Sequence, residues 1–167
     1  MVTGAGFTLR EALPADVPAL HRLMRCFAAY EKLTDRFTIS EAQLQDALFG
    51  SRPVIEAILA EADGAAIGFA VWYFLFGTFS GRLGLFVEDV FVEQSWRGRG
   101  IGLALFRHMA RVARQRHCAQ MLWEVLDWNT PAIDFYRRIG ATPVRGWTTQ
   151  QLSGDALSAL AAGANNG

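Results

Sequence analysis

The chain has 167 residues, the size of one ordinary domain, and 51% of them are hydrophobic. Its 16 basic residues balance its 16 acidic ones, which argues against a general electrostatic hold on nucleic acid. No uninterrupted apolar stretch is long enough to cross a bilayer, and residues 1–6 lack the features of a secretory signal. We therefore expect one cytoplasmic domain over residues 1–167, with a tail at 156–167 that can fray, and no nucleic-acid or membrane partner.

The two cysteines, Cys26 and Cys118, are far apart and form neither a CxxC pair nor a disulfide framework. His108 and His117 show no metal-ligand spacing. The sequence therefore predicts two buried free thiols and no metal site.

The first third of the chain predicts a strand followed by two helices. Residues 7–10 alternate apolar and polar side chains as a strand does. A helix follows to about Tyr30, with apolar residues at spacings of three and four. Ser40 and Gln43 fit a capping box, in which each side chain satisfies a free backbone N–H of the other residue, so a second helix should start here and end near Gly50.

The middle of the chain predicts strands. Residues 55–60 and 67–76 are separated by the turn at 62–64 and should form a hairpin. After a loop at 77–81, residues 83–92 form another predicted strand.

That last strand carries two adjacent acids, Glu88 and Asp89. Neighbouring residues of a regular strand point to opposite faces, so at most one of the two acids faces a given pocket. Both could line the same pocket only if a bulge breaks the alternation.

The last third predicts two more helices. One begins at Ile101 and ends near His117, and residues 121–126 read as a strand. Thr130 suits the N-cap of the next helix and Pro131 its first position.

That helix should end at Gly140. Two short terminal strands are expected within residues 143–152.

Three glycines introduce the helix that begins at Ile101, in the sequence Arg97-Gly98-Arg99-Gly100-Ile101-Gly102. A glycine-rich turn entering a helix exposes backbone N–H groups at the positive end of the helix dipole, which suits a pyrophosphate. Glycines also occur wherever a helix and a strand pack closely. The spacing differs from the dinucleotide fingerprint and from the P-loop, so the turn alone leaves both interpretations open.

The residues around the turn form a wider pattern. Glu88-Asp89-Val90-Phe91-Val92 precedes it, and Asp127-Trp128-Asn129, Pro131 and Phe135-Tyr136 with Gly140 follow it. From Phe7 to about Leu152 the chain resembles the GNAT superfamily of acetyl-CoA-dependent N-acetyltransferases. Within it, the chain is most similar to the diamine (polyamine) acetyltransferases and their relatives acting on thialysine-type amino acids. The resemblance implies an α/β (α+β) fold with a mixed, mostly antiparallel sheet of about six or seven strands and about four helices.

The resemblance also implies how acetyl-CoA would bind. Backbone groups of Val90, Phe91 and Val92 would pair with the pantetheine arm, which needs an edge opened by a splay between neighbouring strands. The pyrophosphate would lie on the turn, at Arg97, Gly98, Arg99, Gly100, Ile101, Gly102 and Leu103. Asn129 and Ala132 would contact the cofactor further along, and Tyr136 would stand near the thioester sulfur.

Two residues are the catalytic candidates that the resemblance supports. The Tyr136 hydroxyl can return a proton to the leaving sulfur, although an aromatic packed beside Phe135 is the plainer interpretation. Glu88 can take a proton from the incoming ammonium, directly or through water, although a strand acid paired with an arginine is the plainer interpretation.

Tyr30, Glu31, Glu88 and Asp89 are the candidates for binding the amine. Glu31 could hold a distant ammonium or simply be a solvated acid at a helix end. The loop 77–81 lacks the acidic residue that polyamine enzymes carry there. A smaller amine, or an amino acid whose carboxylate extra acids would repel, is therefore as plausible as a polyamine.

The predicted function is transfer of the acetyl group of acetyl-CoA to a primary amine of a small molecule by direct attack. Two alternatives remain: a CoA-binding sensor without transfer activity, and an enzyme that acetylates protein N-termini or lysines. The resemblance further implies a homodimer.

Overall fold

The computed structural model describes residues 2–4 and 6–163. The chain forms two compact units, Met1–Glu124 and Val125–Gly167, and each is described by itself. The expectation of a single domain stays a prediction.

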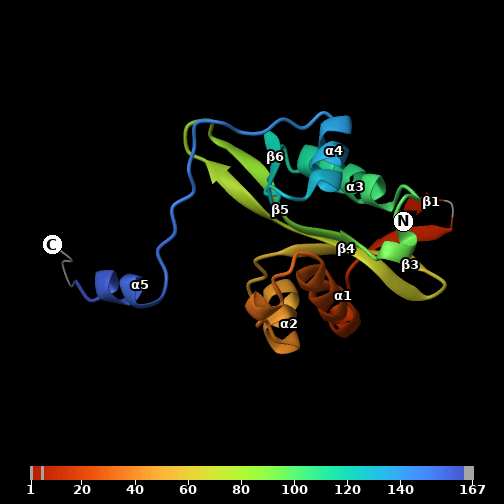
Figure 1. The fold of residues 1–167 in the computed structure, drawn as a ribbon, viewed down its shortest axis with the longest axis horizontal. Helices are drawn as coiled ribbons and strands as arrows, with labels where there is room; N and C mark the ends of the chain where they lie inside the picture. Colours follow the sequence, from red (N-terminus) through yellow and green to blue (C-terminus); the bar gives the residue numbers. More distant parts are fainter. Residues whose placement is uncertain (1, 5, 164–167) are drawn as a thin grey trace. The chain divides into compact units, whose positions relative to one another are not determined.

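The first unit is built on a six-stranded sheet whose strands follow one another in sequence order (Figure 1). All neighbouring strands are antiparallel except β5 and β6, which are parallel. The mixed, mostly antiparallel sheet of the predicted fold class is thus confirmed. The strands are β1 (Val2–Gly4), β2 (Phe7–Glu11), β3 (Glu56–Ala62), β4 (Ala65–Gly77), β5 (Arg82–Val92) and β6 (Gln120–Trp123).

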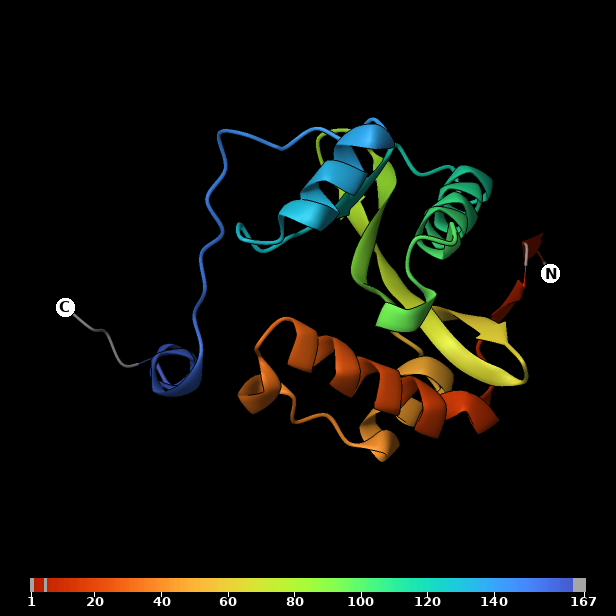
Figure 2. The ribbon, with the colours of Figure 1, turned by 45° about the vertical axis from the view of Figure 1, so that its right-hand side comes forward.

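Helices cover both faces of this sheet. Helices α1 (Val17–Tyr30) and α2 (Glu41–Phe49) lie on one face and α3 (Ile101–Gln115) on the other, as Figures 1 and 2 show. Three 3-10 turns connect the elements: η1 (Pro14–Asp16), η2 (Thr34–Arg36) and η3 (Gln94–Trp96).

The predicted capping box at the start of α2 is confirmed. The Gln43 backbone N–H donates to Ser40 Oγ at 3.2 Å, and the Ser40 N–H donates to Gln43 Oε1 at 2.8 Å. These two bonds satisfy helix-end donors that would otherwise lack partners.

A hydrophobic core fills the space between α1, α2 and the sheet. Leu20 and Leu23 of α1 and Leu44 of α2 are fully buried against Leu59, Phe69 and Val71 of the strands. The strand residues in this core alternate along β3 and β4, as side chains on one face of a sheet must. The α1–α2 layer is therefore fixed against β3 and β4, and β4 is the strand that pairs with β5.

The second unit holds α4 (Thr130–Arg138) and α5 (Gly154–Ala161). The described residues thus contain five α-helices, one more than predicted. The additional helix, α5, lies in the segment expected to fray; residues 164–167 lie outside the described part of the chain.

The prediction of two terminal strands within residues 143–152 is wrong. These residues have no regular structure, and Val144 and Trp147 are 66% and 81% exposed. Pro143 has no N–H to give to a strand partner, and Gly146 takes a φ of 85°, which interrupts an extended run.

Two smaller predictions also need correction. Cys118 is buried as expected, but Cys26 is exposed, because α1 turns it away from the sheet. The N-cap of α4 is Asn129 instead of Thr130, since the Asn129 side chain accepts a hydrogen bond from the Ala132 N–H.

Candidate active site

A β-bulge brings two neighbouring carboxylates to the same side of the sheet. Val71 of β4 lies opposite Asp89, whereas the next residue, Trp72, lies opposite Val87, so Glu88 is an extra residue without a partner. A bulge of this kind breaks the alternation of side chains. Glu88 and Asp89 accordingly line the same cavity, which is the exception that the sequence left open.

The cavity, hereafter the acidic cavity, has a volume of about 690 Å³ and lies between the α1–α2 layer and the strands. Its acidic groups are Glu31, at the end of α1, and Glu88 and Asp89 on β5. Among the described residues, no arginine or lysine pairs with any of these three carboxylates. The interpretation of Glu88 as an acid paired with an arginine is therefore wrong. The remaining wall is mostly apolar, with Met24, Phe27, Leu33, Phe37, Ile39 and Val71.

Asp89 holds its proton more tightly than an ordinary carboxyl does. Burial is the main cause that raises the pKa of Asp89 to about 7, and the negative charges of Glu88 and Glu31 add to it. Burial also raises the pKa of Glu31, which lines the cavity and is partly exposed. An arriving ammonium would relieve this repulsion.

Directly after the bulge, β5 has an open edge. Strand β6 pairs only with Gly84 to Val87, and its last pair joins Val87 to Trp123. Val90, Phe91 and Val92 pair with β4 on one side but with no strand of the described chain on the other. An open edge is thus present because β6 ends at Trp123, and backbone N–H and C=O groups face outward there, while the splay that the resemblance implies stays a prediction.

The glycine turn follows this open edge. Gly98 and Gly100 have φ values of 77° and 82°, a conformation that favours glycine. A Cβ atom on Gly98, Gly100 or Gly102 would have no neighbour within 4 Å, so open space lies above the turn. With α3 beginning at Ile101, the free N–H groups of its first turn border that space.

The side chains of Arg97 and Arg99 both contact other residues of the protein. Arg97 Nε donates to the Val92 carbonyl at 2.9 Å, and its guanidinium lies 4.4 Å from the centre of the Tyr30 ring. Arg99 stacks on Trp96 at 4.5 Å. Arg97 thus connects the turn, the end of β5 and the end of α1, next to Glu31.

Not every predicted site residue lies in this assembly. Tyr30 does not line the acidic cavity; its ring packs under Arg97, so its role towards the amine stays a prediction. Asn129, Ala132 and Tyr136 belong to the second unit. There Asn129 caps α4, and the Tyr136 ring lies edge-on to Phe135, with 5.6 Å between ring centres.

Sequence reasoning missed one charged residue of the cavity. Arg36, at the end of η2, lines the acidic cavity together with the three acids. The sequence did contain a signal for it. Arg36 follows Glu31 by five residues in the same loop between two predicted helices, so both side chains could have been considered for one site.

No helix in the described part of the chain is long and apolar enough to cross a membrane. Over the same residues, His, Cys, Asp and Glu side chains form no group of three that could hold a metal ion.

The sheet order, the open edge after the bulge and the glycine turn entering α3 are together typical of an acetyltransferase fold. Residues 18–141 match the acetyltransferase (GNAT) family, and the chain belongs to it. The protein is thus an acetyltransferase.

Among curated proteins, thialysine N-epsilon-acetyltransferase of Sus scrofa is 36% identical over 168 residues, covering 94% of this chain and 98% of the relative. L-ornithine N5-acetyltransferase of Arabidopsis thaliana is 27% identical, covering 91% of this chain and 86% of the relative. Among solved structures, an integron cassette protein of V. cholerae superposes with a TM-score of 0.79 at 26% identity, covering 95% of this chain and 99% of that one.

Proposed function

We propose that the protein transfers the acetyl group of acetyl-CoA to a primary amine of a small molecule, a polyamine, a diamine or a lysine-like amino acid. The observation that carries the proposal is the acidic cavity at the bulge of β5, directly before the open edge and the glycine turn of the same chain segment. An acidic cavity attracts an ammonium, and a glycine turn at a helix start attracts phosphate. The relatives named for thialysine and ornithine acetylation support the same substrate class.

The residues of the first unit fit the cofactor. The open edge at Val90, Phe91 and Val92 offers the backbone groups that the amides of a pantetheine arm would need. The space above Gly98, Gly100 and Gly102 would admit a pyrophosphate that a Cβ atom would displace. We further assign contacts with the cofactor to Arg97, Arg99, Ile101, Leu103, Asn129 and Ala132.

The chemistry then requires three proton transfers. Acetyl-CoA supplies, when bound, a thioester whose carbonyl carbon accepts the amine nitrogen as the carbon–sulfur bond breaks. Glu88 takes a proton from the ammonium, directly or through water, which frees the nitrogen lone pair. The Tyr136 hydroxyl gives a proton to the departing thiolate, and the phenolate so formed regains one, directly or through water, from the nitrogen, which must lose its second proton as the amide forms. Glu31 and Asp89 hold the amine, and Tyr30 borders its site.

Acetyl-CoA should raise the melting temperature of the protein, because a ligand that binds only the folded state stabilises it. A panel of polyamines, lysine analogues and small amines should then release free thiol. The measurements are a thermal melt against cofactor concentration and a thiol assay.

The alternatives give different results in these assays. A melting shift without thiol release from any amine would favour a CoA-binding sensor. Acetylation confined to a peptide library, detected by mass spectrometry, would favour a protein acetyltransferase. No shift at high cofactor concentration would overturn the proposal.

Replacing Glu88 by Gln should lower kcat/KM by about tenfold, less than the ~10²–10⁴ that one positioned base can contribute. The loss is limited because Asp89 lines the same cavity and can accept the proton in its place. The measurement is the pH profile of kcat/KM for the best amine of the panel. An unchanged rate at every pH would remove Glu88 from the mechanism.

A cytoplasmic location and a homodimer remain part of this proposal. They rest on the resemblance to the diamine acetyltransferases and their relatives.

A further inference from the structure

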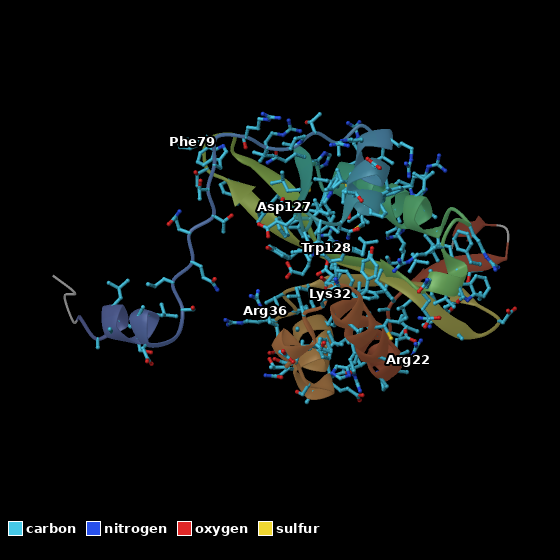
Figure 3. The ribbon with its side chains drawn as sticks, viewed as in Figure 1. Arg22, Lys32, Arg36, Phe79, Asp127 and Trp128 are labelled. Carbon is cyan, nitrogen blue, oxygen red and sulfur yellow. The ribbon has the colours of Figure 1, made fainter. Side chains whose placement is uncertain are left out.

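The acidic cavity carries charges of both signs. Glu31, Glu88 and Asp89 are its acids, and Arg36 is the one basic side chain among the described residues that line it. Arg36 comes from η2, in the loop that follows α1, where Figure 3 shows it together with Lys32. A cavity built only to hold a polycation would gain nothing from an arginine in its wall.

The arginine and the acids do not neutralise one another. Within the described residues, the Arg36 guanidinium makes no hydrogen bond or ion pair, and none of the three carboxylates does so with it. The charges that act on Asp89 are those of Glu88 and Glu31, and Arg36 is not among them. The positive and negative groups therefore lie at separate places in the cavity.

The wall shared with these groups is apolar. Phe27, Leu33 and Phe37 line the cavity along with the charged residues. Leu33 and Phe37 flank η2 in sequence, so the arginine stands beside a surface suited to methylene groups. A ligand with a carboxylate, a short alkyl chain and a terminal ammonium would match all three features.

We propose that Arg36 binds the α-carboxylate of the acceptor, so that the protein selects α-amino acids with a side-chain amine over the diamines that lack this carboxylate. The inference rests on the proposed function, because it concerns the acceptor cavity of that reaction. A guanidinium can hold a carboxylate by two parallel N–H donors, which gives orientation as well as attraction. A diamine would instead bring a second positive charge towards Arg36.

The test uses pairs of amines that differ only in the carboxylate: lysine with cadaverine, and ornithine with putrescine. The Arg36→Gln variant should lower kcat/KM for the amino acids by about 10- to 100-fold, the range expected for a charged hydrogen bond. The diamines should lose little. Arg36→Glu should reverse the preference, since a carboxylate at this place attracts the second ammonium.

Arg52→Gln is the matched control, because Arg52 is exposed, loses the same charge on substitution and does not line the cavity. It should leave the ratio between the members of each pair unchanged. Equal loss for both members in Arg36→Gln, or no loss for either, would overturn the inference.

Calorimetric binding of lysine and cadaverine separates this inference from the proposed function. Lysine binding that is lost in Arg36→Gln but retained in Arg52→Gln, without thiol release by the wild type, would support carboxylate recognition and contradict acetyl transfer. Transfer to diamines in preference to amino acids by the wild type would support the proposed function and overturn the role of Arg36. Absence of lysine binding by the wild type, with cofactor present, would also overturn that role.

Discussion

The Tyr136→Phe variant is expected to lose about 10²-fold or more in kcat while it keeps its affinity for acetyl-CoA, because a positioned proton donor contributes ~10²–10⁴-fold. The substitution removes one hydroxyl and leaves the ring that lies against Phe135. Departure of a thiolate without a proton donor is slower, whereas the cofactor contacts assigned to the glycine turn and the open edge are untouched. Single-turnover thiol release measures the first quantity and the melting shift with acetyl-CoA the second.

Tyr73→Phe is the comparison for this variant. It makes the same chemical change in the wall of the acidic cavity, where burial and then Glu88 and Glu124 raise the pKa of the Tyr73 hydroxyl. The Tyr73 hydroxyl stays protonated near these carboxylates and has no assigned role in protonating the thiolate. The kcat of this variant should therefore fall far less than that of Tyr136→Phe. Equal rates of Tyr136→Phe and the wild type would remove the proton donor from the proposed mechanism.

The Asp89→Asn variant is expected to be more stable than the wild type above pH 7, by up to about 4 kcal/mol. Asp89 has a pKa of about 7 in the folded protein against an ordinary value of 3.8. Below pH 4 the carboxyl is protonated in both the folded and the unfolded state, so it contributes no difference. Between pH 4 and pH 7 the unfolded state loses its proton first, and the free energy of unfolding of the wild type falls. Asparagine carries no charge and escapes this loss.

Urea unfolding at several pH values measures the effect. The stability gain of Asp89→Asn should vanish near pH 4 and reach its full size above pH 7. Glu88→Gln should give a smaller gain over the same range, because Glu88 is exposed and acts mainly by repelling Asp89. A gain of equal size at pH 4 and pH 8 would mean that ionisation of Asp89 is not its cause.

The sequence was most informative where a pattern is local. The alternation in residues 7–10, the spacing of Leu20 and Leu23 on α1 and the Ser40–Gln43 capping box each depend on neighbours in the chain, and the structure confirms all of them. The glycine turn belongs to the same group, since a positive φ at Gly98 and Gly100 is a property of a few adjacent residues.

Features that depend on distant partners were not predictable in the same way. The bulge at Glu88 exists because Val71 and Trp72 of β4 pair with Asp89 and Val87. The sequence of β5 alone does not indicate this pairing. The prediction of strands in residues 143–152 was wrong because these residues have no strand partner in the described part of the chain. Side chains such as Val144 and Trp147 favour strands, but a strand also needs a partner with free backbone groups.

Arg36 was not predicted as a site residue, because η2 is too short for a periodic pattern that would assign its side chains to one face. Its neighbours Leu33 and Phe37 belong to a short loop, and only the folded chain shows that this loop lines the same cavity as the acids.

The bulge at Glu88 also divides β5 into two stretches with separate tasks. The stretch before it, from Arg82 to Val87, pairs with β4 throughout and with β6 from Gly84 onwards, and it joins the hairpin loop 77–81. Because the Val71–Asp89 pairing sets the register after the bulge, the loop can vary in length and composition without moving Asp89 or the open edge. A change of loop length between β4 and β5 would therefore leave the acidic cavity and the open edge in place.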